Sequence, residues 1–190
     1  MTIIGITGGI GSGKSSVCEV IGKLGYPVYN SDVAAKRLMH SDASLIRVIK
    51  LEFGVSIYKD DKLDRNALAD VVFKNPDKLK SLNAEVHPAV ARDFEEWCLA
   101  QKTEMVFKEA AILFETGGDK QMDKTILIHA PMQERIERVI KRDGVTEDAI
   151  LSRMTNQWSD ERKIPLADYV IENHSDHLII PQILEVVKGL

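Results

Sequence analysis

The sequence predicts an α/β fold in which helices cover both faces of a mostly parallel β-sheet. Short runs rich in β-branched residues alternate with stretches of helical periodicity along most of the 190 residues, and this alternation is typical of parallel sheets. A glycine-rich segment joins the first such run to the first helical stretch. The block from about residue 34 to residue 101 contains helical patterns alone, which indicates an insertion into the sheet domain.

The first strand and the first helix enclose the glycine-rich segment. Residues 2–7 (TIIGIT) predict a short buried strand. Residues 14–24 predict a helix, because apolar side chains at positions 17, 20, 21 and 24 share one face. Between them, the sequence fits the phosphate-loop (P-loop) pattern G-x-x-x-x-G-K-[ST] with Gly8, Gly13, Lys14 and Ser15. A dinucleotide-binding fingerprint would need glycine at position 14 and is excluded.

The P-loop predicts binding of nucleotide phosphates together with Mg²⁺. Its glycines let the chain curl so that backbone N–H groups point at phosphate oxygens, and the helix N-terminus adds partial positive charge. Lys14 would reach the β- and γ-phosphates, and the Ser15 hydroxyl would be a ligand of Mg²⁺. The predicted phosphate-binding residues are Gly8, Gly11, Ser12, Gly13, Lys14, Ser15 and Ser16. The strand–loop–helix context predicts the three-layer fold of P-loop NTPases.

The other elements of the sheet domain follow after the insertion. Strands are expected at residues 26–30, 103–107, 124–129 and 168–171, and a second apolar run, residues 110–114, ends at Glu115. Helices are expected at residues 131–144, 146–157 and 180–188, and Gly144 is expected to end the first of these.

The insertion is expected to contain four helical segments. They begin after Asp32, near residue 45, at residue 63 and at Asn75, where Asn-Pro is typical of an N-cap followed by proline in the first turn. Pro88 is expected to break or kink the last segment near His87, because proline lacks an N–H and crowds the preceding turn.

Composition limits the class of partner and the compartment. The net charge of −4 argues against non-specific nucleic-acid binding. No apolar run approaches the length of a membrane span, and a strand occupies the place of a basic signal region. Cys18 and Cys98 form no motif, so we expect reduced thiols in a cytoplasmic protein. His174 and His177 have no further metal-type ligands near them in sequence, so no zinc site is expected.

Six features occur in order along nearly the whole chain. They are ITGGIGSGKS at 6–15, Asp32, LDRNALADVVFKNPDKLKSLNAEVHPAV at 63–90, ILFE at 112–115, ERVIKRDG at 137–144 followed by Arg153 and Gln157, and ADYVIEN at 167–173. Together they resemble the dephospho-CoA kinases, which catalyse the last step of coenzyme A synthesis. The order LNAEVHP, ILFE, RDG is far more specific than the P-loop alone.

The chain departs from that family's pattern at two places. The family often reads D-x-P-L-L-F-E, and this chain has Glu109 and Ala111 at the Asp and Pro positions. The family often reads D-A-D around Asp32, and this chain has Asn30-Ser31-Asp32. The last acid of that motif is kept. Glutamate can still accept a hydrogen bond from magnesium-bound water, so the resemblance implies Glu109 as a metal-site residue.

The resemblance implies transfer of the γ-phosphoryl group from ATP to the ribose 3′-hydroxyl of dephospho-CoA, with Lys14 in a catalytic role. Asp32 follows the strand expected beside the P-loop and would accept or orient the proton of the attacking hydroxyl; its position alone leaves helix capping equally open. Arg65 and His87 are candidate contacts to the acceptor, with a surface or packing role as the alternative for each.

Basic residues are concentrated in and after the helix expected at 131–144. The resemblance implies a lid in which Arg138 and Arg142 stabilise the transferring charge and Arg153 binds ATP. Acidic residues lie between them, so a solvated surface is the alternative. We prefer that alternative for Arg135, Lys141, Arg162 and Lys163.

These observations predict a monomeric enzyme with ATP and Mg²⁺ at a discontinuous core, residues 1–33 and 102–190. Residues 34–101 would be the acceptor-binding insertion, and residues 138–163 the lid. One alternative is a nucleoside monophosphate kinase, which shares the P-loop, the insertion and the lid. Another is a regulatory nucleotide-binding module, although such a module would more readily have lost Lys14 or Asp32.

Overall fold

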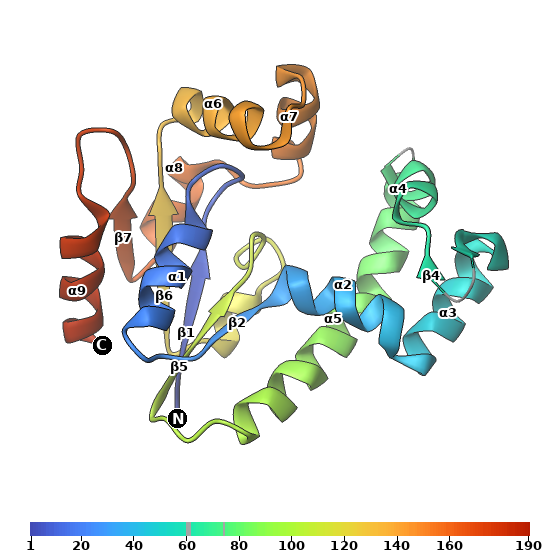
Figure 1. The fold of residues 1–190 in the computed structure, drawn as a ribbon, viewed down its shortest axis with the longest axis horizontal. Coiled ribbons are helices and arrows are strands. Elements are labelled where there is room, and N and C mark those ends of the chain that lie inside the picture. The colour runs from blue at the N-terminus through green and yellow to red at the C-terminus, as the bar shows by residue number, and fades with distance from the viewer. Residues whose placement is uncertain (60–61, 74) are drawn as a thin grey trace. The chain divides into compact units, whose positions relative to one another are not determined.

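The computed structural model describes residues 1–59, 62–73 and 75–190, and the chain divides into two compact units. The first unit comprises residues 1–30 and 102–190 and contains the sheet. The second comprises residues 31–101 and is mostly helical (Figure 1).

The sheet of the first unit is parallel throughout. Its strands lie in the order β2-β5-β1-β6-β7. They are β1 (Thr2–Thr7), β2 (Val28–Asn30), β5 (Met105–Glu109), β6 (Lys124–His129) and β7 (Tyr169–Glu172). The predicted α/β class is therefore confirmed. β5 lies between β1 and β2; the order of parallel strands depends on crossovers that local sequence does not encode.

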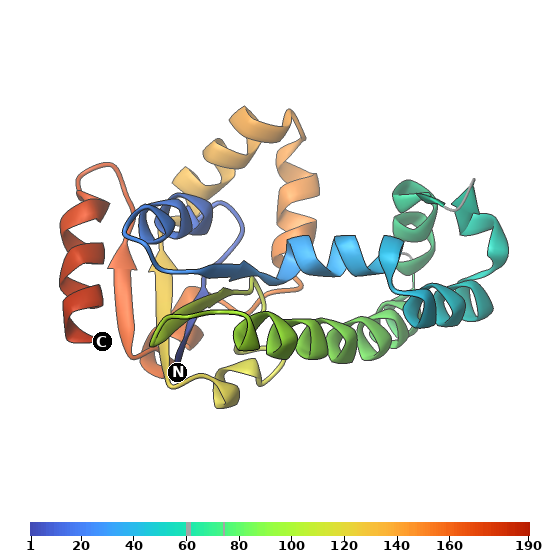
Figure 2. The ribbon, with the colours of Figure 1, turned by 60° about the horizontal axis from the view of Figure 1, so that its bottom comes forward.

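Two helices cover one face of this sheet. Side chains from β1, β5, β6 and β7 form a buried cluster with α1 (Lys14–Lys23) and α9 (Ile179–Gly189). Figures 1 and 2 show α9 beside β7 at one edge of the sheet, and α9 also contacts α1. The cluster contains Ile4, Ile6, Val17, Ile21, Phe107, Ile126, Ile128, Ile171, Ile183 and Val186. This packing fixes the first turn of α1 against the carboxyl end of β1.

Two expected strand regions differ in the structure. β2 begins at Val28 because Pro27 has no N–H for the ladder, although the Pro27 carbonyl still accepts a 2.9 Å bond from Phe107 N. The apolar run 110–114 forms turns after β5. The side chains of Leu113 and Met122 lie beside Gly5, so this segment covers the opposite face of β1.

The second unit is built around its longest helix. This helix, α5 (Pro76–Leu99), contacts α2 (Ser31–Ser41), α3 (Ala43–Phe53) and α4 (Arg65–Phe73). A short 3₁₀ turn, Val55–Ile57, leads into the two-residue strands β3 (Tyr58–Lys59) and β4 (Lys62–Leu63). These strands are too short to show an alternating pattern, and the sequence did not indicate them.

Pro88 does not break α5. The helix is continuous from Pro76 to Leu99, so the break expected near His87 does not occur. Proline at position 88 removes the N–H that would bond the Ala84 carbonyl. Burial of one helix face offsets that loss; its members are Leu82, Val86, Ala89, Val90 and Phe94. The predicted N-cap of α5 is confirmed, because the Asn75 side chain accepts hydrogen bonds from Asp77 N and Lys78 N.

The last part of the first unit contains α6 (Met132–Asp143), α7 (Glu147–Met154), α8 (Asp160–Lys163) and a 3₁₀ turn, Ile164–Leu166. Gly144 ends α6 in the left-handed region with φ 66°. A buried cluster of Ile136, Val139 and Ile150 joins α6 to α7. Within the described residues, no helix is long and apolar enough to cross a membrane.

Candidate active site

The P-loop connects the carboxyl end of β1 to the first turn of α1. Gly11 and Gly13 have φ of 80° and 96°, a region that side-chain-bearing residues rarely adopt. The loop is closed by a 3.1 Å bond from Ser12 N to the Gly9 carbonyl, and the Ser12 side chain is buried. The positive φ angles turn the backbone into a concave loop at a helix N-terminus, which is a phosphate-binding arrangement.

Lys14 lies across its own loop. Its Nζ donates 2.9 Å and 3.4 Å bonds to the carbonyls of Gly8 and Gly9 and is 4.0 Å from Glu109 Oε1. The ammonium is mostly shielded from solvent, since 12% of the side chain is exposed. A flexible four-carbon stem can carry this charge from the loop carbonyls to a phosphate.

Glu109 is a buried acid at the end of β5, directly beside β1. It is 4% exposed, and its carboxylate accepts a hydrogen bond from the Asn30 side chain at the end of β2. Asn30, which replaces the first Asp of the family's D-A-D pattern, thus supplies an amide donor to Glu109, which replaces a shorter Asp. Burial, together with the negative charge of Glu109, raises the pKa of the Cys18 thiol to about 12, so Cys18 is a neutral thiol.

The residues beside the P-loop suit Mg²⁺. Ser15 is exposed at the second position of α1, and Glu109 supplies a carboxylate near Lys14. Among the described residues, no group of three His, Cys, Asp or Glu side chains could hold a metal ion. A magnesium ion in a kinase needs one or two protein oxygens, with phosphates and waters completing its shell, so these two residues fit it.

The three proposed lid arginines lie in two groups. Arg142 donates two bonds to the neighbouring Asp143, and Arg153 on α7 also contributes to lowering the pKa of that carboxyl. Arg138 instead donates to Glu134 on its own helix and to the Asn173 carbonyl after β7. Arg142 and Arg153 therefore share one acid, whereas Arg138 is tied to the edge of the sheet.

Two basic residues expected on a solvated surface are buried, so that expectation is wrong for them. Arg135 is 9% exposed; its Nε donates a 2.9 Å bond to the Ile10 carbonyl, and its Nη1 lies 3.2 Å from Asp160 Oδ2. Lys163 is fully buried and forms a 2.7 Å ion pair with Glu115. Arg135 lies one turn before Val139 on the apolar face of α6, a periodicity that could have indicated its burial.

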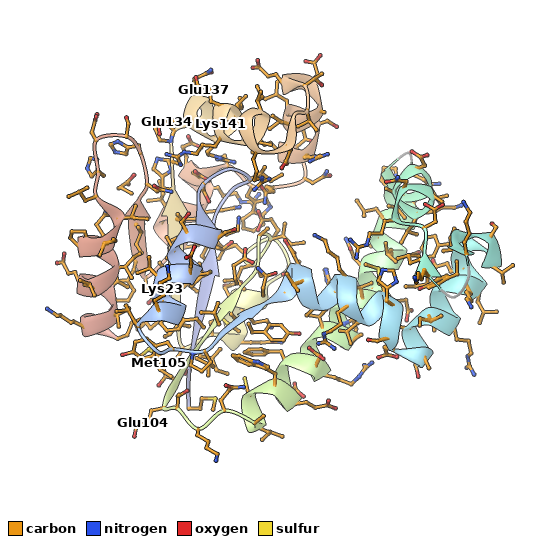
Figure 3. All side chains as sticks on the ribbon, in the orientation of Figure 1. Lys23, Glu104, Met105, Glu134, Glu137 and Lys141 are labelled. Carbon is orange, nitrogen blue, oxygen red and sulfur yellow. The ribbon has the colours of Figure 1, made fainter. Side chains whose placement is uncertain are left out.

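The remaining surface expectations agree with the structure. Lys141 is exposed on α6, where Figure 3 also labels Glu134 and Glu137. Arg162 is exposed, and its guanidinium carbon lies 3.3 Å from the ring centre of Trp158.

Comparison with known proteins identifies the family. The profile of the dephospho-CoA kinase family matches residues 2–178. A dephospho-CoA kinase of Salinibacter ruber is 41% identical over 177 residues, covering 91% of this chain and 89% of that protein. One of Bacteroides fragilis is 35% identical over 188 residues, covering 98% and 92%. This chain belongs to the dephospho-CoA kinase family.

Solved structures agree with this assignment. A crystal structure of a Thermus thermophilus protein has a TM-score of 0.90 and 37% identity, covering 99% of this chain and 96% of that chain. The dephospho-CoA kinase from Campylobacter jejuni has a TM-score of 0.70 and 26% identity, covering 98% and 96%. Shikimate kinase from Acinetobacter baumannii, 12% identical with a TM-score of 0.57, shares the P-loop kinase fold. The family is one of ATP-dependent phosphotransferases.

The dephospho-CoA kinase residues expected to meet the acceptor lie in the second unit. Asp32 is exposed in the first turn of α2; it is not the N-cap residue, because that helix already begins at Ser31. Arg65 is exposed at the first position of α4, with Nη2 3.5 Å from His40 Nε2. His87 is exposed on α5, and partial desolvation there lowers its pKa, which favours the neutral imidazole near pH 7.

Two further side chains meet the P-loop, in roles that the sequence did not indicate. Gln157 Oε1 accepts a 2.9 Å bond from Ile10 N, and its amide donates to the Ala111 carbonyl. Asn173 Nδ2 donates a 2.7 Å bond to the Ser12 carbonyl. Both residues lie in segments that carried the family resemblance. Gln157 is 147 positions from Ile10 and Asn173 is 161 positions from Ser12, so no local pattern could indicate these contacts.

Proposed function

We propose that this chain is a dephospho-CoA kinase that converts ATP and dephospho-CoA into ADP and CoA. The observation that carries the proposal is the P-loop, with three positive-φ glycines and with Lys14 at the start of α1, in a chain that matches the family over residues 2–178. Phosphoryl transfer has a loose transition state, so the protein must mainly position the reactants and neutralise charge.

In the proposed step, the ribose 3′-oxygen forms a bond to the γ-phosphorus as the bond to the β–γ bridging oxygen breaks. ADP leaves with the electron pair, and Asp32 accepts the proton of the hydroxyl. Lys14 and the P-loop N–H groups hold the phosphates. Mg²⁺, when bound by Ser15 and through water by Glu109, supplies charge neutralisation at the phosphate oxygens.

The other roles are proposed for parts of the chain. Arg138 and Arg142 stabilise the transferring charge and Arg153 contacts ATP, with residues 138–163 as a lid. Residues 34–101 bind the acceptor, to which Arg65 and His87 contribute. A cytoplasmic location and a monomeric state stay predictions from the sequence.

The test is ADP release from ATP and Mg²⁺, with dephospho-CoA compared against a panel of nucleoside monophosphates. Lys14→Ala serves as the blank. We expect turnover with dephospho-CoA alone. Turnover with a nucleoside monophosphate alone would assign the acceptor unit to a different kinase. A lack of turnover with every acceptor would favour a regulatory nucleotide-binding module.

A further inference from the structure

Three side chains from other segments of the sheet domain form hydrogen bonds with the backbone of the P-loop. Arg135 on α6 binds the Ile10 carbonyl, Gln157 binds Ile10 N, and Asn173 after β7 binds the Ser12 carbonyl. We call these three residues the clamp. They belong to the same compact unit as the P-loop but come from three separate segments of it.

The clamp lies in direct contact with the loop glycines. A Cβ atom added at Gly9 would overlap the Arg135 guanidinium, and one added at Gly13 would overlap the Asn173 amide. At Gly11 the same addition would overlap the Arg135 backbone carbonyl. The Ile10 side chain packs against the buried cluster between α6 and α7. The glycines thus make room for the clamp as well as for a phosphate.

The clamp fixes the direction of two N–H groups. In a trans peptide the carbonyl and the N–H of the next residue point in opposite directions, and the chain contains no cis peptide among its described residues. Because Arg135 holds the Ile10 carbonyl, Gly11 N–H points away from Arg135; because Asn173 holds the Ser12 carbonyl, Gly13 N–H points away from Asn173. Within the described part of the chain, neither of these N–H groups donates to a protein group.

The clamp residues are themselves braced. Asp160 is 5% exposed; its Oδ2 accepts a hydrogen bond from Arg135 and lies 2.8 Å from His129 Nδ1. Asn173 N donates to the His129 carbonyl, and the Asn173 carbonyl accepts from Arg138. Arg135 is therefore held at its side chain and Asn173 at its backbone, which leaves little freedom for the loop carbonyls that they bind.

We propose that Arg135 and Asn173 are positioning residues that aim Gly11 N–H and Gly13 N–H at the β-phosphate of the nucleotide. The inference rests on the proposed use of ATP, but it concerns nucleotide binding and is independent of the acceptor. Preorganised donors cost no reorganisation when the phosphate binds, so loss of the clamp weakens the phosphate contacts specifically.

The experiment compares binding of ADP and AMP to three variants by calorimetry, with AMP measured by competition where it is weak. Asn173→Leu removes the donor at similar volume. Arg135→Lys keeps a cation for Asp160 but lacks the fork that also reaches Ile10. Lys23→Met, which replaces an exposed cation at the end of α1, is the control (Figure 3). Melting temperature is recorded for each variant.

For Asn173→Leu and Arg135→Lys we expect ADP to bind about tenfold more weakly, the size expected for one hydrogen bond to a charged group. AMP affinity and the KM for dephospho-CoA should stay within about twofold of the parent's, as should all values for Lys23→Met. Unchanged ADP affinity in both clamp variants would overturn the proposal. Equal weakening of ADP and AMP with a lower melting temperature would also overturn it, because that pattern indicates general disruption.

The proposed function can fail separately. A parent protein that prefers ADP to AMP but does not phosphorylate dephospho-CoA would contradict the assigned acceptor and leave the clamp standing. A parent protein with no preference for ADP over AMP would overturn the clamp.

Discussion

Gly13 carries two constraints at once, a backbone φ of 96° and contact with the Asn173 amide. Gly25 has a similar φ of 93° with no atom near its Cβ position. A substitution at Gly25 introduces backbone strain alone, whereas a substitution at Gly13 introduces both backbone strain and steric overlap.

We predict that Gly13→Ala lowers kcat/KM for ATP about 100-fold, the cost of misplacing a phosphate-binding loop by about 1 Å. Gly25→Ala should lose about 1–2 kcal/mol of stability from the strained φ and keep its activity. Steady-state kinetics and thermal melting measure both. Equal activity of the two variants would show that the contact with Asn173 is unimportant.

Asp32 offers a second separable test at the residue scale. It is exposed in the first turn of α2, so its amide analogue should leave the fold intact. We predict that Asp32→Asn lowers kcat by about 10²–10⁴-fold, the usual contribution of a general base. ADP affinity should be unchanged. A variant with the parent's kcat would remove Asp32 from the proposed mechanism.

At the scale of elements, Pro88 lowers the stability of α5, because it lies in the interior of that helix. Proline in a helix interior costs about 3 kcal/mol, and part of this is offset by reduced freedom of the unfolded chain. Pro76 of the same helix is at its first position, where proline is favourable.

We predict that Pro88→Ala raises the free energy of unfolding by about 1–2 kcal/mol, because it restores an N–H for the Ala84 carbonyl. Pro76→Ala should bring no gain. Chemical denaturation of both variants checks the comparison. A loss of stability in Pro88→Ala would mean that the proline ring itself packs favourably.

The Asp168 carboxylate, directly before β7, connects that strand to the start of β6. Asp168 accepts bonds from Lys124 Nζ, Thr125 N and the Thr125 hydroxyl. The bond from Lys124 is the main cause of its lowered pKa, and both bonds from Thr125 contribute, against partial desolvation. A lowered pKa means that the stabilisation is present above the unfolded-state pKa of about 4 and is lost as the pH falls through the folded-state pKa.

Asp168→Asn should therefore lower the melting temperature at pH 7 by about 2–4 °C, corresponding to about 1 kcal/mol for a half-exposed group. The difference from the parent should shrink as the pH falls below about 4. Melting curves from pH 3 to pH 7 measure it. A difference that is constant over this range would contradict the role of the charge.

At the scale of the whole molecule, nucleotide and acceptor are assigned to different compact units. The P-loop and its clamp lie in the unit of residues 1–30 and 102–190, whereas Arg65 and His87 lie in residues 31–101. A substitution in the acceptor unit should therefore change the KM for dephospho-CoA without changing the affinity for the nucleotide.

We predict that Arg65→Ala and His87→Ala each raise the KM for dephospho-CoA about 3–10-fold, the loss of one polar contact. The affinity for ADP should not change. Because the pKa of His87 is lowered, its contribution should persist above pH 7, where the imidazole is neutral. Parallel loss of ADP affinity would contradict the assignment of these residues to the acceptor.

The family resemblance covered most of the chain, and the α/β class followed from the alternation of strands and helices. The site was predicted unevenly. The P-loop depends on glycines next to Lys14 and Ser15 in sequence, so it was found directly. The clamp residues Arg135 and Asn173 were not, because each meets the loop across more than 120 positions of sequence.

The sequence by itself determined the strand–loop–helix at residues 2–24, the N-cap at Asn75 and the end of α6 at Gly144. These features depend on backbone freedom and on hydrogen bonds between near neighbours, which local residue types encode. Only the tertiary structure decided that β5 separates β1 from β2, and that Arg135 and Lys163 are buried. The burial of a charged side chain depends on whether a distant segment brings an opposite charge or a carbonyl to it, and a local pattern holds no record of that partner.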